Sequence, residues 1–508
     1  MIPNCQGADV LITKPVMPCL KSRADETAYI HGETSRLDDI IQQLHGERAM
    51  LLRRLNAVQA TTSVFPPETL SLIFQFTCLP SLSANSEVSP FEGADGPIGP
   101  NECTARLFHL RLAAVSWLWR QVVHTTPQLW SFISLKATDV TSLLRLHFDN
   151  SGSLPLDLTL SGCSGLNMDS YLHTTISEHF VQRNLLRIQS LKVSAPPGAW
   201  LFFSHYLTGL VELTLDLVHK PSSLTTASAN VIDLVLTNHP HLRKVNLYSG
   251  HYAKIELPWA TITALNLHGI AADICAGTVV QCHNLAELIF DAKPSQQPYD
   301  GSSLSHPVTL RNLHTLKWVY HADSWSRGVL GCLQLPALET LTWVEMYLGP
   351  YDEGTVSFLS HLPSTLSSLI LLNFSIWCSA ESILLDLLPP HVNLESLRLV
   401  DSDPDFILRV IHKITPTSCN SFSSLRKLTI KESKNVTGLS GGFECPEFSN
   451  GMLEMLEARN RVHPQCPFRV EFIWIDFGWE TEDQMHIQGL LDAGARIQVV
   501  VKPDYEKD

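Results

Sequence analysis

The chain has 508 residues, 44% of them hydrophobic and 17% charged, which is too apolar for a disordered protein and ample for a large core. Its formal net charge of -14 and the absence of a basic stripe argue against nucleic-acid binding. No apolar run is long enough to span a membrane, and Lys14 and Pro15 interrupt the apolar run at the N-terminus, so no secretory signal is expected. The composition predicts a cytoplasmic or nuclear protein with no nucleic acid and no membrane among its partners.

The twelve cysteines are scattered from Cys5 to Cys466 without any CxxC pair. This pattern favours reduced thiols that serve mostly as small core residues. Cys275 and Cys282 form the closest pair, on a predicted helix, but no His or Cys lies at zinc-site spacing from them. No metal and no cofactor are expected.

The N-terminal part contains one amphipathic segment. Residues 1–34 show no sustained period and are predicted to be a disordered tail, whereas residues 35–60 are predicted to form a helix. Its apolar positions recur every seven residues, with two more between them: Leu37, Leu44, Leu51 and Val58, then Ile41 and Leu55. Arg48 interrupts this short seam, so packing onto the helical motif that follows or onto the domain after it is favoured over dimerisation.

A split motif follows between residues 61 and 135. In its first half, Pro66 and Pro67 stop any preceding helix and suit the start of a new one, with Glu68 in its first turn. Leu70, Ile73 and Phe74 then form one helical stripe. The second half runs from Leu112 to Arg120 and closes at 126–130 with Thr-Pro-Gln-Leu-Trp; Trp117 and Trp119 should point to different sides. An insert at about 80–104, rich in Ser, Pro and Gly, predicts a surface loop between the halves.

This combination resembles an F-box of the type found in basidiomycete fungi. The family pattern is a Leu before Pro-Pro-Glu, an Ile-Phe pair, a distal Val-Cys-x-x-Trp-Arg and a closing Pro-x-Leu-Trp; this chain has Phe65 for the Leu and Ser116 for the Cys. The resemblance implies docking onto a Skp-type adaptor and through it onto a cullin. The residues expected to carry that contact, without a division between core and interface, are Pro66, Pro67, Glu68, Leu70, Ile73, Phe74, Val115, Trp119, Leu129 and Trp130.

From residue 154 to residue 508 the chain repeats the pattern Leu-x-x-Leu-x-Leu, with apolar substitutes. The central residues of nine copies are Leu213, Val245, Leu265, Leu288, Leu316, Leu341, Leu369, Leu397 and Leu428. Their spacing of 20 to 32 residues centres on the leucine-rich-repeat range. Strands with such a motif, alternating with helices, predict a solenoid with a parallel sheet. An ordinary doubly wound α/β sheet is the alternative.

Connecting helices or helical turns are expected at 229–236, 276–282, 356–362 and 383–388, and a helix at 452–459. A strand over 468–477, a turn at Gly494 and a last strand over 496–501 should close the array.

No catalytic constellation emerges. Residues 438–442 match GxSxG but lack the apolar strand that leads into a nucleophile elbow. Asp401, Asp403 and Asp405 resemble the start of a calcium loop, yet Phe406 replaces the required Gly, which favours a solvated turn. The 22 histidines form no HExxH motif.

The predicted fold is therefore α/β: a small helical F-box domain followed by an irregular leucine-rich-repeat-like solenoid. The resemblance implies a non-catalytic substrate-recognition subunit of an SCF-type E3 ubiquitin ligase that binds an unknown target protein through the repeats. Two alternatives stay open: an F-box scaffold that works outside a ligase, and a repeat scaffold whose F-box no longer binds an adaptor.

Overall fold

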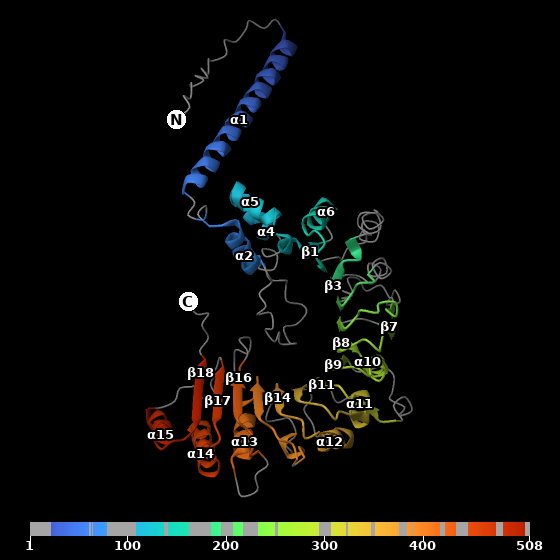
Figure 1. The fold of residues 1–508 in the computed structure, drawn as a ribbon, viewed down its shortest axis with the longest axis vertical. Coiled ribbons are helices and arrows are strands. Elements are labelled where there is room, and N and C mark those ends of the chain that lie inside the picture. Colours follow the sequence, from blue (N-terminus) through green and yellow to red (C-terminus); the bar gives the residue numbers. More distant parts are fainter. Residues whose placement is uncertain are drawn as a thin grey trace. The chain divides into compact units, whose positions relative to one another are not determined.

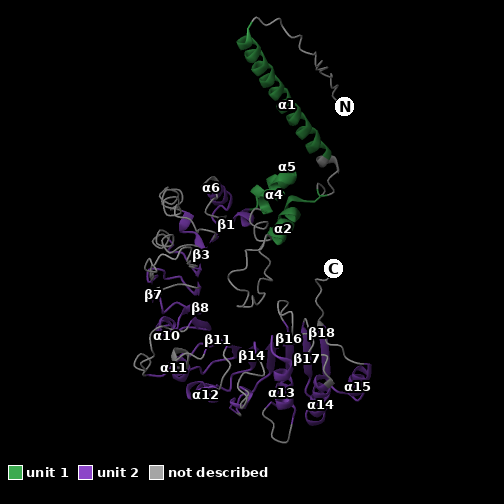
Figure 2. Ribbon diagram, turned by 180° about the vertical axis from the view of Figure 1, so that it is seen from behind, with its two compact units in different colours: residues 1–79, 107–126 green, residues 80–106, 127–508 purple. Residues whose placement is uncertain are grey.

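The computed structural model describes residues 22–59, 62, 65–78, 108–136, 141–161, 184–194, 207–216, 232–248, 252–293, 306–321, 324–346, 351–374, 384–389, 391–416, 422–432, 446–473 and 481–502. The chain divides into two compact units, coloured separately in Figure 2. Residues 1–79 and 107–126 form the helical unit, and residues 80–106 and 127–508 form the repeat unit. The predicted insert and the GxSxG match at 438–442 lie outside the described residues.

The helical unit opens with α1, a 37-residue helix from Arg23 to Gln59. Its first residues fall in the segment predicted to be disordered, so that prediction is wrong for 23–34. The helix begins there because Ser22 caps it: its Oγ accepts a hydrogen bond from the Asp25 backbone N–H (3.2 Å), and Asp25 and Glu26 place negative charge in the first turn. The prediction relied on apolar periodicity, and a polar cap such as Ser22 does not contribute to that periodicity.

Three shorter helices complete the helical unit: α2 (Pro67–Cys78), α4 (Phe108–Val115) and α5 (Trp117–His124). The second half of the predicted motif is divided at Ser116, between α4 and α5. The Ser116 side chain accepts a hydrogen bond from the Trp119 backbone N–H (3.1 Å) and so starts a new helix at Trp117.

The repeat unit is built on a 14-stranded sheet whose neighbouring strands all run parallel (Figure 1). Its strands, in spatial order, are β1 (Phe132–Lys136), β2 (Leu156–Ser161), β3 (Ile188–Ser194), β4 (Glu212–Asp216), β6 (Lys244–Tyr248), β8 (Ala264–Ala271), β9 (Glu287–Lys293), β11 (Thr315–Tyr320), β13 (Thr340–Glu345), β14 (Ser368–Leu372), β15 (Ser396–Val400), β16 (Lys427–Lys431), β17 (Phe468–Ile473) and β18 (Ile497–Lys502). The sheet starts at Phe132, ahead of the predicted domain start at 154.

The helices of the repeat unit include α10 to α14, which lie along one side of the strands in Figure 1. The bounds are α6 (Thr141–Asn150), α10 (Ala272–Val279), α11 (Ser324–Cys332), α12 (Glu353–Ser360), α13 (Pro404–Ile414), α14 (Pro446–Val462) and α15 (Thr481–Asp492), with 3₁₀ turns η3 (Pro127–Trp130) and η4 (Leu384–Asp386). Helical structure is thus confirmed near 276, 356, 383 and 452.

The helix predicted over 229–236 is wrong. Residues Ile232–Val235 form strand β5, which pairs in parallel with β7 (Tyr252–Glu256) in a separate two-stranded sheet. Another such pair joins β10 (Val308–Thr309) and β12 (Leu333–Gln334). The β-branched residues of β5 suit a strand, and a run of four residues is too short to show a period.

The repeated leucines stand in register across the sheet. Leu288 on β9 pairs with Leu316 on β11, which pairs with Leu341 on β13, and the same row continues at both ends. All three side chains are fully buried. Since each strand covers its leucines with those of its neighbours, the repeat unit is a leucine-rich-repeat-like solenoid.

Aromatic residues replace leucine in the middle of the second buried row. The Phe290 and Trp318 rings are stacked, with centroids 4.1 Å apart and an interplanar angle of 2°, and Trp343 stacks with Tyr320 at 5.4 Å. Phe290 and Trp318 are in register on neighbouring strands, and the strand spacing is close to a stacking distance, so their rings pack face to face. Tyr320 is in register with Glu345, so its contact with Trp343 runs diagonally between β11 and β13.

The C-terminal elements agree with the predicted closure. Strand β17 and strand β18 flank α15, and Gly494 takes the positive φ of 88° that its turn requires. Within the described ranges, no helix combines the length and the apolar character needed to cross a bilayer.

We expect Leu316→Ala to lower the free energy of unfolding of the repeat unit by about 2 to 5 kcal/mol, because it leaves a cavity between two in-register leucines. Urea denaturation measures this loss. Glu287→Ala, at an exposed position at the start of β9, is the matched control and should change it by about 0.5 kcal/mol or less. A loss as small as that for Leu316→Ala would contradict the packing described here.

Candidate functional site

The interior of the helical unit uses part of the predicted motif. Leu70 and Phe74, one turn apart on α2, are each only 1% exposed. The Trp119 ring of α5 packs on Phe74 with centroids 4.8 Å apart, and its Nε1–H donates to Thr62 Oγ1 at 3.3 Å. These residues hold α2 against α5, so they shape the unit and offer little surface.

A second set of apolar side chains on the same helices is exposed. On α2, Leu72, Ile73 and Phe76 point away from the buried stripe, and Phe76 is 79% exposed. Val115 at the end of α4 is also exposed, and Trp117 on α5 is 68% exposed. Five large apolar side chains exposed on so small a unit are candidates for an interaction surface. We call these five residues the apolar surface of the helical unit.

The predicted site residues therefore separate into groups. Ile73 and Val115 lie on the apolar surface, Leu70 and Phe74 are buried, and Trp119 is half-buried. Pro66, Pro67 and Glu68 are exposed at the start of α2, where the Pro66 carbonyl accepts from the Leu70 backbone N–H at 3.1 Å.

Leu129 and Trp130 belong instead to the repeat unit. Trp130 is fully buried and packs edge-on against His147 of α6, with centroids 5.3 Å apart. His147 Nδ1 lies 3.2 Å from the Trp130 carbonyl oxygen, and burial, opposed in part by that contact, lowers the pKa of His147. These two residues anchor the first strand of the sheet.

Sequence reasoning missed Leu72, Phe76 and Trp117 as surface residues. The spacing of Leu72 and Phe76 shows that they share a helix face, because residues four apart do so. The sequence does not show which of the two faces is buried: the face of Leu70 and Phe74 points into the unit, and the face of Leu72 and Phe76 points to solvent.

The face of the sheet opposite the leucines carries a row of polar side chains. Asp216, Tyr248, His268 and Asp291 stand in register on β4, β6, β8 and β9. The His268 and Tyr248 rings lie 5.6 Å apart. Alternation along each strand places these residues outward, because the leucines take the other positions.

Asp291, at the β9 end of this polar row, is contacted by two histidines. Its carboxylate accepts a hydrogen bond from His268 Nδ1 at 2.5 Å and another from His321 Nε2 at 3.2 Å. Burial alone would raise the pKa of Asp291, but the hydrogen bonds and charges of the two histidines outweigh it and hold that pKa below its ordinary value. Burial raises the pKa of Asp216 and of Tyr248. The arrangement offers hydrogen-bonding groups to a partner and has no activated nucleophile.

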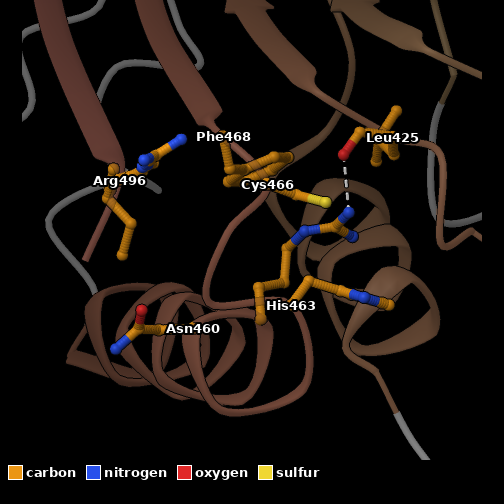
Figure 3. A pocket seen from close by; sticks show the side chains of 8 residues that line it. Leu425, Asn460, His463, Cys466, Phe468 and Arg496 are labelled. Atoms are coloured by element: carbon orange, nitrogen blue, oxygen red, sulfur yellow. Dashed lines mark hydrogen bonds between the residues drawn. The ribbon is translucent and has the colours of Figure 1, made fainter. Parts of the chain in front are cut away.

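A small pocket near the C-terminal end holds a buried cation (Figure 3). The Arg459 guanidinium donates to the carbonyl oxygens of Leu425 (2.6 Å) and Phe422 (3.2 Å), and lies 4.4 Å from the centroid of the Phe468 ring. Burial lowers the pKa of Arg459 to about 10, which leaves it charged at neutral pH. Backbone carbonyls occupy this cation, so it ties α14 to the loop before β16 and is not placed to hold an anion.

The aspartates of the calcium-like motif have a structural role. Asp403 Oδ1 accepts from the Asp405 backbone N–H at 2.9 Å and caps α13, while Asp401 takes a left-handed φ of 51°. Among the residues that the structure describes, no three His, Cys, Asp or Glu side chains are grouped so that they could hold a metal ion.

Comparisons with known proteins add little to this picture. No protein-family model and no curated protein matches the chain. Among solved structures, a leucine-rich-repeat protein of Leptospira interrogans is similar, with 11% sequence identity over 74% of this chain and 91% of that one, and a TM-score of 0.28. The leucine-rich-repeat character therefore rests on the strand register of this chain itself.

Thiol reactivity provides a test of the expected role of the cysteines. Cys282 is fully buried, and burial raises its pKa to about 12, so it stays protonated at pH 8 and should resist alkylation by iodoacetamide. Cys466 is exposed and should react readily. Mass spectrometry of peptides labelled with and without urea measures both. Equal labelling of the two cysteines in the folded protein would overturn this assignment.

Proposed function

We propose that this chain is a substrate-recognition subunit of an SCF-type E3 ubiquitin ligase. In this proposal the helical unit binds a Skp-type adaptor, which connects it to a cullin, and the repeat unit binds a target protein. The chain makes and breaks no bonds itself. It raises the local concentration of target lysines near a ubiquitin-loaded conjugating enzyme.

The apolar surface of the helical unit is the observation that carries the proposal. Its side chains lie within the F-box-like sequence, on α2, α4 and α5, yet the interior of the unit is closed by Leu70, Phe74 and Trp119 without them. Apolar side chains that the fold does not need, including an exposed tryptophan, match the anchors that dominate protein interfaces.

The polar row of the repeat unit supports the second half of the proposal. Solenoids bind proteins through extended surfaces built from successive repeats, and the row at Asp216, Tyr248, His268 and Asp291 spans four neighbouring strands. The phenol ring, the imidazole and the two carboxylates of this row, with the His321 imidazole that contacts Asp291, are suited to a polar segment of a target protein.

Adaptor binding can be tested with two exposed residues of α2. We expect the full-length variant Ile73→Asp/Phe76→Asp to bind a purified Skp-type adaptor about thirtyfold or more weakly, because loss of buried apolar anchors costs about 2 kcal/mol or more. Calorimetric titration of the adaptor measures the change. Circular dichroism should show an unchanged fold, since neither side chain is buried.

The matched control is Met485→Asp on α15, which introduces the same charge at another exposed apolar position. It should leave adaptor affinity unchanged. Retained affinity in the α2 variant would reject the helical unit as an adaptor-binding site. Adaptor bound without a cullin in the purified complex would instead support a role outside a ligase.

The insert provides a separate prediction. Deleting residues 83–99 should leave adaptor affinity within about threefold of the full-length chain, since the sequence predicts a surface loop there and loop length has a small effect on folding free energy. The same titration measures it. A loss comparable to that of Ile73→Asp/Phe76→Asp would place the insert in the interface.

A further inference from the structure

The helix α1 carries an apolar stripe that the described residues leave uncovered. Leu37, Ile41, Leu44, Leu51 and Leu55 are all exposed, and Leu51 is 66% exposed. A 37-residue helix is about 55 Å long, and helices owe most of their stability to packing of an apolar face. Packing of this stripe onto the neighbouring helices, the arrangement favoured from sequence, is not what the described residues show.

We propose that α1 binds α1 of a second copy of the chain as an antiparallel two-stranded coiled coil. The stripe advances in steps of three, four or seven residues, as the a and d positions of a heptad do. The d positions are Ile30, Leu37, Leu44 and Leu51, and the a positions are Thr34, Ile41, Arg48 and Leu55.

In one antiparallel alignment, each a position of one helix lies opposite a d position of the other. With Ile41 opposite Leu44 of the second copy, Thr34 lies opposite Leu51 and Leu55 lies opposite Ile30. The axis of symmetry then falls near residue 42, close to the middle of a helix that runs from Arg23 to Gln59. The two helices therefore overlap over nearly their whole length.

Arg48 is the one charged residue in the seam and distinguishes the two directions. In a parallel pair, Arg48 would face Arg48 of the second copy, and two cations would be desolvated together. In the antiparallel pair it faces Leu37, and its long apolar stem can cover that leucine while the guanidinium reaches the adjacent Asp38.

The flanking charges favour the same direction. At the antiparallel g positions, Glu33 lies beside Arg54 of the second copy, and at the e positions Asp38 lies beside His45. In a parallel pair Glu33 would lie beside Asp38, which is repulsive. The ion pair of Glu33 with Arg36 within one helix leaves this arrangement possible, because Arg36 is outside the seam.

The oligomeric state of the full-length chain tests the proposal. Light scattering after size exclusion should give twice the mass of one chain at micromolar concentration, and Ile41→Asp/Leu44→Asp should give a monomer. Met50→Asp is the matched control, because Met50 is exposed on α1 but off the stripe, and it should stay dimeric. A monomeric unaltered chain, or a dimer that survives the double substitution, would overturn the proposal.

The direction is tested by disulfide formation between copies. A mixture of Thr34→Cys and Leu51→Cys chains should crosslink at these residues, as mapped by mass spectrometry, whereas Leu51→Cys alone should not crosslink to itself through that residue. Self-crosslinking of Leu51→Cys would show a parallel pair and overturn the antiparallel arrangement.

A charge exchange gives an independent readout. Glu33→Arg should raise the dimer dissociation constant about tenfold, since two ion pairs are lost by symmetry, and Glu33→Arg/Arg54→Glu should restore it. No restoration would contradict the proposed pairing. Adaptor affinity of Ile41→Asp/Leu44→Asp should be unchanged, so failure of this proposal and failure of the proposed function can be told apart.

Discussion

The in-register rows of leucine on parallel strands are the constraint on which the repeat unit depends. A strand in this sheet has no buried partner for its leucines except the strands on either side and the helices packed behind them. The opposite face is less constrained by folding, because it contributes fewer buried residues, among them Val319 and Val344. It is on this face that Asp291 and its two histidines lie, and they vary the chemistry of the surface without altering the solenoid.

The helical unit differs from the repeat unit because it is small and buries few residues. Phe74 and Trp119 close its interior by one aromatic contact, which leaves the other side of α2 apolar and exposed. The same excess appears on α1, whose stripe is not needed to hold the helical unit together. Both surfaces fit a protein whose stable form is an assembly, in which partner chains cover the apolar side chains that the single chain exposes.

The repeat unit could be predicted from the sequence because its signal is local and repeated: each Leu-x-x-Leu-x-Leu gave a strand at the expected place, such as β11 around Leu316. The errors have particular causes. The start of α1 depends on the Ser22 cap, and β5 is too short for a period. The division of the candidate site failed for a different reason. Whether Phe74 or Phe76 faces inward depends on where α5 packs against α2. The burial of Trp130 depends on its contact with His147 of α6, which lies outside the motif. The residue pattern of the motif predicts neither contact.

The pairing order of the sheet has a kinetic consequence. Each strand of the main sheet pairs with the next main-sheet strand along the chain, so paired residues are between 20 (Val245 and Leu265) and 42 (Leu428 and Val470) positions apart in sequence. A parallel sheet is usually slow to form because its strands must find distant partners, but here the search is short at every step. Folding can begin at any well-packed pair of repeats and spread in both directions. The stacked rings of Phe290 and Trp318 join two such repeats at the centre of the array.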